Sequence, residues 1–215
     1  MLVRYWLNTY RFHPVSLNID AVLKEVTISQ RKKKLNQMIQ GNGLQDAYSA
    51  RLARVGAQDG GMLRLNMEAL MWLSHSNRAL NANELCQGSE VAIGSTDLDC
   101  QNIPAIEILR GCYFGLVTLE ESSNTLHLVH YTLEEYLSEN ADLFPSPHSG
   151  IAEVSSRYLN FRSIKSLLPA HLWSRKGPPL LEYTSCYWGK PARGGITTSV
   201  NTFTLRLPDR FDKLD

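Results

Sequence analysis

The residue types that commonly perform chemistry occur in this sequence, but their spacing does not assemble a catalytic centre. Four of the glutamates form two adjacent pairs, Glu120-Glu121 and Glu134-Glu135. Adjacent side chains point in different directions, which does not suit the paired carboxylates of acid–base catalysis. Gly41-Asn42-Gly43 lacks the third glycine of a dinucleotide-binding loop, and no phosphate-binding loop, nucleophile elbow or His-Glu-x-x-His motif occurs. We therefore expect a protein that is not an enzyme and that carries no cofactor.

The cysteines indicate a reducing cellular compartment rather than a metal site. No Cys-x-x-Cys pair and no neighbouring histidine pair accompanies them, so we expect no bound metal. Four cysteines do not form a disulfide framework in a chain of 215 residues, and no Asn-x-Ser/Thr site occurs, which favours a reducing, intracellular and cytoplasmic environment. We expect most of the cysteines to be small buried hydrophobic residues. They are Cys86, Cys100, Cys112 and Cys186.

The distribution of charge restricts the partners that the chain can have. The sequence has 22 basic and 21 acidic residues, a balance that disfavours a dedicated nucleic-acid-binding protein. The only dense basic run, Arg31-Lys32-Lys33-Lys34, could contact phosphate or direct nuclear import, but it also fits the solvated side of a helix over 29–39. No apolar run approaches the ~18 residues of a membrane span, and the N-terminus lacks signal-peptide features, so we expect no membrane association.

Helical spacing of apolar residues predicts mainly α-structure up to residue 113. The helix over 63–73 is apolar on more than one side, so we expect it to be central, with Trp72 buried. Asn81 is predicted to cap the helix that holds Leu85, and Pro104 to lie in the first turn of the last helix. The predicted helices are 29–39, 44–55, 63–73 after a break at 59–61, a short helix after Asn81, and 103–113.

A β-hairpin and a further helix follow these helices. Two short β-rich runs, 116–119 and 125–129, flank five polar residues, which predicts a two-stranded hairpin. Directly after it, Thr132 and Glu135 have the spacing of a capping box at a helix N-terminus. Three helices followed by a hairpin are the layout of a winged helix. The predicted fold is therefore mainly α, with a helical segment and a winged helix that has one two-stranded β-hairpin.

Seven runs of the sequence together resemble a known family. They include Ala69-Leu-Met-Trp-Leu-Ser-His75 and Leu128-Val-His-Tyr-Thr-Leu-Glu-Glu-Tyr-Leu137, and the others are 16–23, 93–98, 102–104, 148–154 and 181–189. In this order they resemble the segment that follows the nucleotide-binding domain of fungal NACHT–ankyrin proteins, which are signal-transducing ATPases of the NOD-like type. That segment contains a winged-helix domain that is also named after GPI inositol-deacylase. No match lies upstream of residue 13 or after residue 191.

The resemblance implies a non-catalytic regulatory or interaction module that contacts protein. In the parent protein its partners would be its own NACHT and ankyrin domains, and other proteins are the alternative. In NOD-like ATPases a histidine in a Met-His-Asp-like motif after the hairpin touches the phosphates of ADP and holds the closed state. Val129-His130-Tyr131 stands at the matching place, so the resemblance implies a nucleotide-sensing role for His130. The alternative is a structural histidine at a strand–helix junction.

Two other function classes compete with this module. A nucleic-acid-binding winged helix remains the alternative function, although the helix over 103–113 offers only Glu107 and Arg110 as charged groups. A hydrolase or lipid-modifying enzyme is suggested only by the deacylase name, and no nucleophile–base arrangement supports it.

The resemblance also implies a division of the chain. The nucleotide-binding domain and the ankyrin repeats are absent from the sequence, so we expect a fragment of a longer protein. The division is an unmatched tail over 1–16, a helical linker over 17–60, the winged-helix domain over 61–142, a helical linker over 143–190 and a disordered tail over 191–215.

Overall fold

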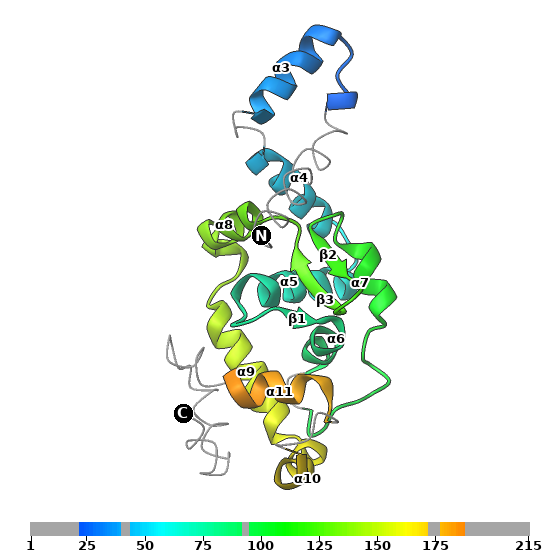
Figure 1. Ribbon diagram of the computed structural model, residues 1–215, viewed down its shortest axis with the longest axis vertical. Coiled ribbons are helices and arrows are strands. Elements are labelled where there is room, and N and C mark those ends of the chain that lie inside the picture. The colour runs from blue at the N-terminus through cyan, green and yellow to red at the C-terminus, as the bar shows by residue number, and fades with distance from the viewer. Residues whose placement is uncertain (1–21, 40–43, 92–94, 172–176, 188–215) are drawn as a thin grey trace.

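Helices dominate the protein, and three short strands form one antiparallel sheet (Figure 1). The computed structural model describes residues 22–39, 44–91, 95–171 and 177–187. The predicted mainly α fold with a small β element is confirmed, whereas the predicted tails over 1–16 and 191–215 lie outside the described residues. The elements are α3 (Ile28–Ile39), α4 (Leu44–Gly56), α5 (Gly60–His75), β1 (Leu80–Asn81), α6 (Ala82–Glu90), α7 (Ile106–Cys112), β2 (Val117–Glu120), β3 (Thr125–Leu128), α8 (Tyr131–Glu139), the 3-10 helix η1 (Ala141–Leu143), α9 (Pro147–Asn160), α10 (Arg162–His171) and α11 (Pro179–Tyr187).

The sheet has one strand more than the predicted hairpin. β2 and β3 pair as expected, with only small differences from the predicted runs 116–119 and 125–129. The strand order is β1-β3-β2, because β1 adds to the free edge of β3 with Leu80 opposite Leu126. β1 has only two residues, which is too short for an alternating pattern to reveal it. The sheet therefore ties the segment before α6 to the segment before α8.

Helix α5 is the central element, as its two apolar sides predict. It contacts α4, α6, α7, α8, α9 and β3. Trp72 is 1% exposed, and its ring lies 5.5 Å from the ring of Tyr183 in an edge-to-face arrangement. The expectation that 59–61 breaks the chain before a helix at residue 63 is corrected, because α5 already begins at Gly60, directly after Asp59.

The structure confirms one of two predicted helix starts and contradicts the other. Asn81 caps α6 as predicted: its side chain accepts from the backbone N–H of Glu84, whose carboxylate in turn accepts from the N–H of Asn81. The predicted place of Pro104 in the first turn of the next helix is wrong. α7 begins only at Ile106, and Ala105 holds an extended conformation before it.

The C-terminal helices belong to the same core as the sheet and α5. α11 packs against α6 and α9. Gln87 of α6 joins all three helices, since its side-chain oxygen accepts from the Tyr158 hydroxyl at 3.2 Å and from the Leu180 N–H at 3.0 Å. One hydrophobic cluster extends from Tyr48 to Tyr183. The core is therefore continuous across the predicted boundary between 61–142 and 143–190.

The cysteines differ from the expectation that most of them are buried. Cys86 is buried in α6, and burial raises the pKa of its thiol to about 11. Cys100 and Cys186 are exposed. The side chain of Cys112 lies outside the described part of the chain.

Candidate functional site

His130 occupies the junction between β3 and α8, where it caps the helix. Its backbone is extended (φ −160°, ψ 152°), and its Nδ1 accepts a hydrogen bond from the Thr132 N–H at 3.3 Å. The predicted cap at Thr132 is wrong, because Thr132 already lies inside α8. The Thr132 hydroxyl instead contacts His130 Nδ1 at 2.8 Å. The structure thus gives His130 the local role of a structural histidine at a strand–helix junction, and its nucleotide-sensing role stays a prediction.

A row of hydrogen-bonded polar groups extends from His130 to α4. The hydroxyl groups of Thr132 and Tyr48 lie 2.9 Å apart, and the Tyr48 ring packs 5.7 Å from the ring of Tyr136. Tyr48 is 1% exposed, and burial raises the pKa of its hydroxyl, opposed in part by the hydrogen bond to Thr132. The Tyr48 hydroxyl thus stays neutral at physiological pH. The row fastens the first turn of α8 to the middle of α4.

An aromatic neighbour lies beside the imidazole of His130. The ring of His130 is half-buried and lies 4.4 Å from the ring of Tyr131, which is 64% exposed. Because Nδ1 accepts from a backbone N–H, the hydrogen-bond geometry assigns the ring proton to Nε2. An imidazole in this state can donate from Nε2 to a phosphate oxygen without losing the cap that Nδ1 provides.

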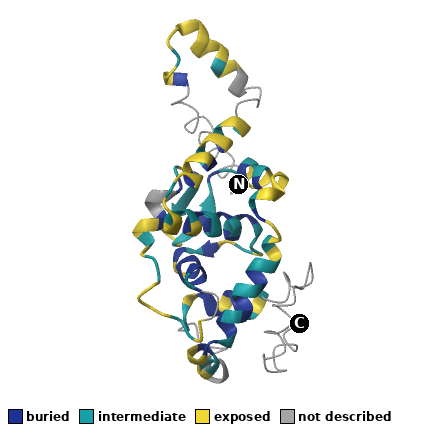
Figure 2. Cartoon of the chain, turned by 180° about the vertical axis from the view of Figure 1, so that it is seen from behind, coloured by how far each residue is buried: buried dark blue, intermediate teal, exposed yellow. Residues whose placement is uncertain are grey.

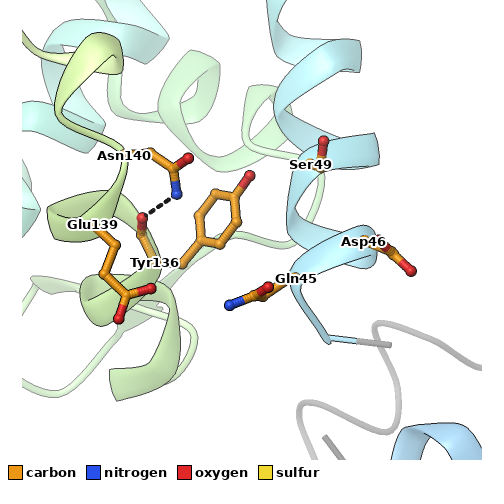
Figure 3. Close-up of a pocket in the computed structure, with 6 residues that line it drawn as sticks. All are labelled: Gln45, Asp46, Ser49, Tyr136, Glu139 and Asn140. Carbon is orange, nitrogen blue, oxygen red and sulfur yellow. Dashed lines mark hydrogen bonds between the residues drawn. The ribbon is translucent and has the colours of Figure 1, made fainter. Parts of the chain in front are cut away.

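A cleft of about 460 Å³ lies between α4 and the other end of α8 (Figure 3). Its only charged lining groups are the carboxylates of Asp46 and Glu139. Asn140 closes one side, where its Nδ2 donates to the Tyr136 carbonyl at 2.7 Å. The full lining is Gln45, Asp46, Ser49, Tyr136, Glu139 and Asn140. Two carboxylates and no cation disfavour phosphate here and favour a positively charged group.

The structure separates His130 from this cleft, and the sequence did not reveal the cleft. His130 precedes α8, whereas the cleft residues Tyr136 to Asn140 lie at its C-terminal end. The other lining residues come from α4, about ninety positions earlier in the sequence. The sequence feature that could have indicated it is the concentration of acidic residues on 134–142, none of which has a basic neighbour in that stretch.

The other residues considered for chemistry do not converge. Glu120 lies at the end of β2, where it accepts from the Ser123 hydroxyl at 2.8 Å, whereas Glu134 and Glu135 are exposed on α8. The part of the chain that the structure describes contains no group of three or more metal-ligating side chains. In α7, Glu107 is exposed, and the side chain of Arg110 lies outside the described residues.

Comparison of the sequence with protein-family models, with curated proteins and with solved structures found no match. Within the described ranges, every helix is too short or too polar to cross a membrane.

Proposed function

We propose that the chain is a non-catalytic regulatory or interaction module, built on a winged helix, that acts through contacts with protein. The order α5-β1-α6-α7-β2-β3, with β1 and β2 on either side of β3, supports the winged-helix assignment. In such a unit α7 would be the third helix and the β2–β3 hairpin the wing. Both would present a surface to a partner.

The charge of that surface is the observation that carries the proposal. The wing has Glu120 and Glu121 at its turn, and the described side chains of α7 include exposed Glu107 and the 42% exposed Ile108. Carboxylates repel phosphate, whereas an exposed isoleucine suits a protein partner. Outside residues 22–39, the described residues contain eight basic and sixteen acidic residues, a net charge of −8. A nucleic-acid-binding winged helix remains the less favoured alternative.

We include in this proposal a nucleotide-sensing role for His130 when a NACHT-type nucleotide-binding domain is present. The two interpretations of this histidine are compatible, because a cap uses Nδ1 and a phosphate contact would use Nε2. The partner of the module would then be the nucleotide-binding domain in its ADP-bound form.

The test is titration calorimetry of the chain with an ADP-loaded NACHT-type nucleotide-binding domain. His130→Asp keeps a capping oxygen but replaces the phosphate donor with a negative charge, whereas His130→Ala removes both functions. We expect His130→Asp to weaken binding by at least about tenfold, since a hydrogen bond to a charged group contributes about 1.5–3 kcal/mol.

Two results would contradict this proposal. Equal affinity of His130→Asp and the unaltered chain would leave His130 with its capping role alone. Saturable micromolar binding of a labelled DNA duplex at physiological salt would favour the nucleic-acid alternative over a protein partner.

A further inference from the structure

Helix α3 is a basic amphipathic helix that extends away from the rest of the molecule (Figures 1 and 2). None of its described side chains is buried, and Ile28 is 73% exposed. Leu35, which is 40% exposed, lies seven residues later on the same face. Arg31 and Lys32 flank this apolar stripe. Before the helix, Val26 is 90% exposed.

α3 has its own N-terminal cap, and within the described part of the chain no buried side chain anchors it. Thr27 and Gln30 form a reciprocal box, in which the Thr27 hydroxyl accepts from the Gln30 N–H at 3.2 Å and the Gln30 side chain accepts from the Thr27 N–H at 3.1 Å. Arg31 Nε donates to the Glu25 carbonyl at 2.9 Å. Helices shorter than about 12–15 residues are marginal in water without packing, and α3 has 12 residues. A partner surface would therefore stabilise it.

The same chain carries an acidic surface that complements α3. We define the acidic α4–α8 face as Asp46, Glu134, Glu135, Glu139 and Asp142, all of which are exposed. No ion pair joins any of them to a described basic side chain. The cleft of about 460 Å³ opens between the same two helices, and Tyr136 lines it.

We propose that the chain self-associates, with α3 of one copy docked on the acidic α4–α8 face of a second copy. Residues 22–39 contain five basic and one acidic residue, a net charge of +4, against the −8 of the remaining described residues. The acidic α4–α8 face disfavours an anionic membrane or a nucleic acid as the partner of α3, because phosphate near that face would be repelled. It attracts α3 of another copy. This proposal does not depend on the winged-helix assignment.

The contact would be reciprocal. Each copy offers one α3 and one acidic face, so two copies can exchange both contacts and close a two-fold dimer. The apolar stripe of Ile28 and Leu35 would lie over the cleft, and Arg31 and Lys32, which flank the stripe, would face the carboxylates.

Sedimentation velocity of the full chain tests the proposal with paired charge reversals. The first variant carries Arg31→Glu and Lys32→Glu, and the second carries Glu135→Lys and Glu139→Lys. We expect the unaltered chain to form a dimer whose Kd rises at least about tenfold between about 50 and 500 mM salt, because the contacts are exposed charges. Each variant alone should be monomeric. Their equimolar mixture should dimerise, since each reversed surface then meets its complement.

Sedimentation velocity also provides the control and the outcomes that would overturn the proposal. Arg162→Glu reverses an exposed charge on α10, away from both surfaces, and should leave the dimer unchanged. A monomeric unaltered chain at every concentration would overturn the proposal, whether α3 then folds onto its own cleft or stays free. Dimers that persist in both variants, or variants that do not associate when mixed, would also overturn it. So would a monomer that co-sediments through α3 with vesicles containing phosphatidylserine.

Discussion

Replacing Trp72 with alanine should be among the most destabilising single changes in this fold. The side chain is 1% exposed and meets Tyr183 edge to face at 5.5 Å, so nearly all of its surface leaves water on folding. A buried aromatic side chain covers about 150–250 Å². At about 25 cal/mol per Å² this corresponds to about 4–6 kcal/mol, and an extended reference chain makes that an upper limit. We expect a loss of about 3–5 kcal/mol, as observed for buried aromatic truncations.

Urea unfolding followed by far-ultraviolet circular dichroism measures this loss. Tyr131→Ala is the matched control, since Tyr131 is an aromatic residue that is 64% exposed and should lose no more than about 1 kcal/mol. The slope of the transition should stay similar in both variants, which shows that the change lies in stability. A shift below about 1 kcal/mol for Trp72→Ala would refute the assignment of α5 as the central helix.

Four further outcomes are expected from single substitutions. His130→Ala should lower the free energy of unfolding by about 1 kcal/mol through loss of the α8 cap, and His130→Asp should restore most of it in urea melts. Gly88→Ala should raise it by about 0.5–1 kcal/mol, because an added Cβ meets the Trp72 ring at an ordinary 3.6 Å within a helix. Glu84→Gln should cost about 2–3 kcal/mol, since a 2% exposed carboxylate loses its charged bonds to an arginine. Burial lowers the pKa of His75 below 6.5, so folding favours its neutral form; stability should be full above pH 6.5 and fall as the pH drops below it. His75→Gln should flatten that fall in thermal melts across this range.

The helices could be predicted from the sequence wherever a long apolar pattern determined the packing. The apolar spacing over 44–55 and 63–73 predicted α4 and α5 with small errors in their bounds, because each helix has a face that enters the core. The two-residue strand β1 could not be predicted, since its pairing with β3 is a tertiary contact between residues far apart in sequence. The error at Pro104 has a local cause: proline tolerates a first helical turn but does not require one.

The candidate site was only partly predictable, because its contacts join residues that lie far apart in the sequence. His130 was selected through the resemblance, but the sequence placed the cap at Thr132, whose hydroxyl in the structure contacts His130 and Tyr48 instead. No local pattern carries that information, because Tyr48 lies 84 residues away. The cleft also needs α4 and α8 to be brought side by side. Burial of Trp72, in contrast, followed directly from the apolar sides of its own helix.

Helix α8 connects the two proposals, because each of them concerns one of its ends. His130 precedes its first residue, and Glu139 of the acidic face is its last. At 1.5 Å per residue, nine residues extend about 13 Å, which is short enough for the helix to behave as a rigid body. The Thr132–Tyr48 bond joins α8 to α4, so we expect both helices and the His130 ring to shift together when either end is displaced. Under both proposals, a partner docked at the cleft and a phosphate held by His130 therefore bias the same pair of helices. Thermodynamic linkage then requires each of these ligands to change the affinity of the other by the same factor whenever the two favour different positions of α8.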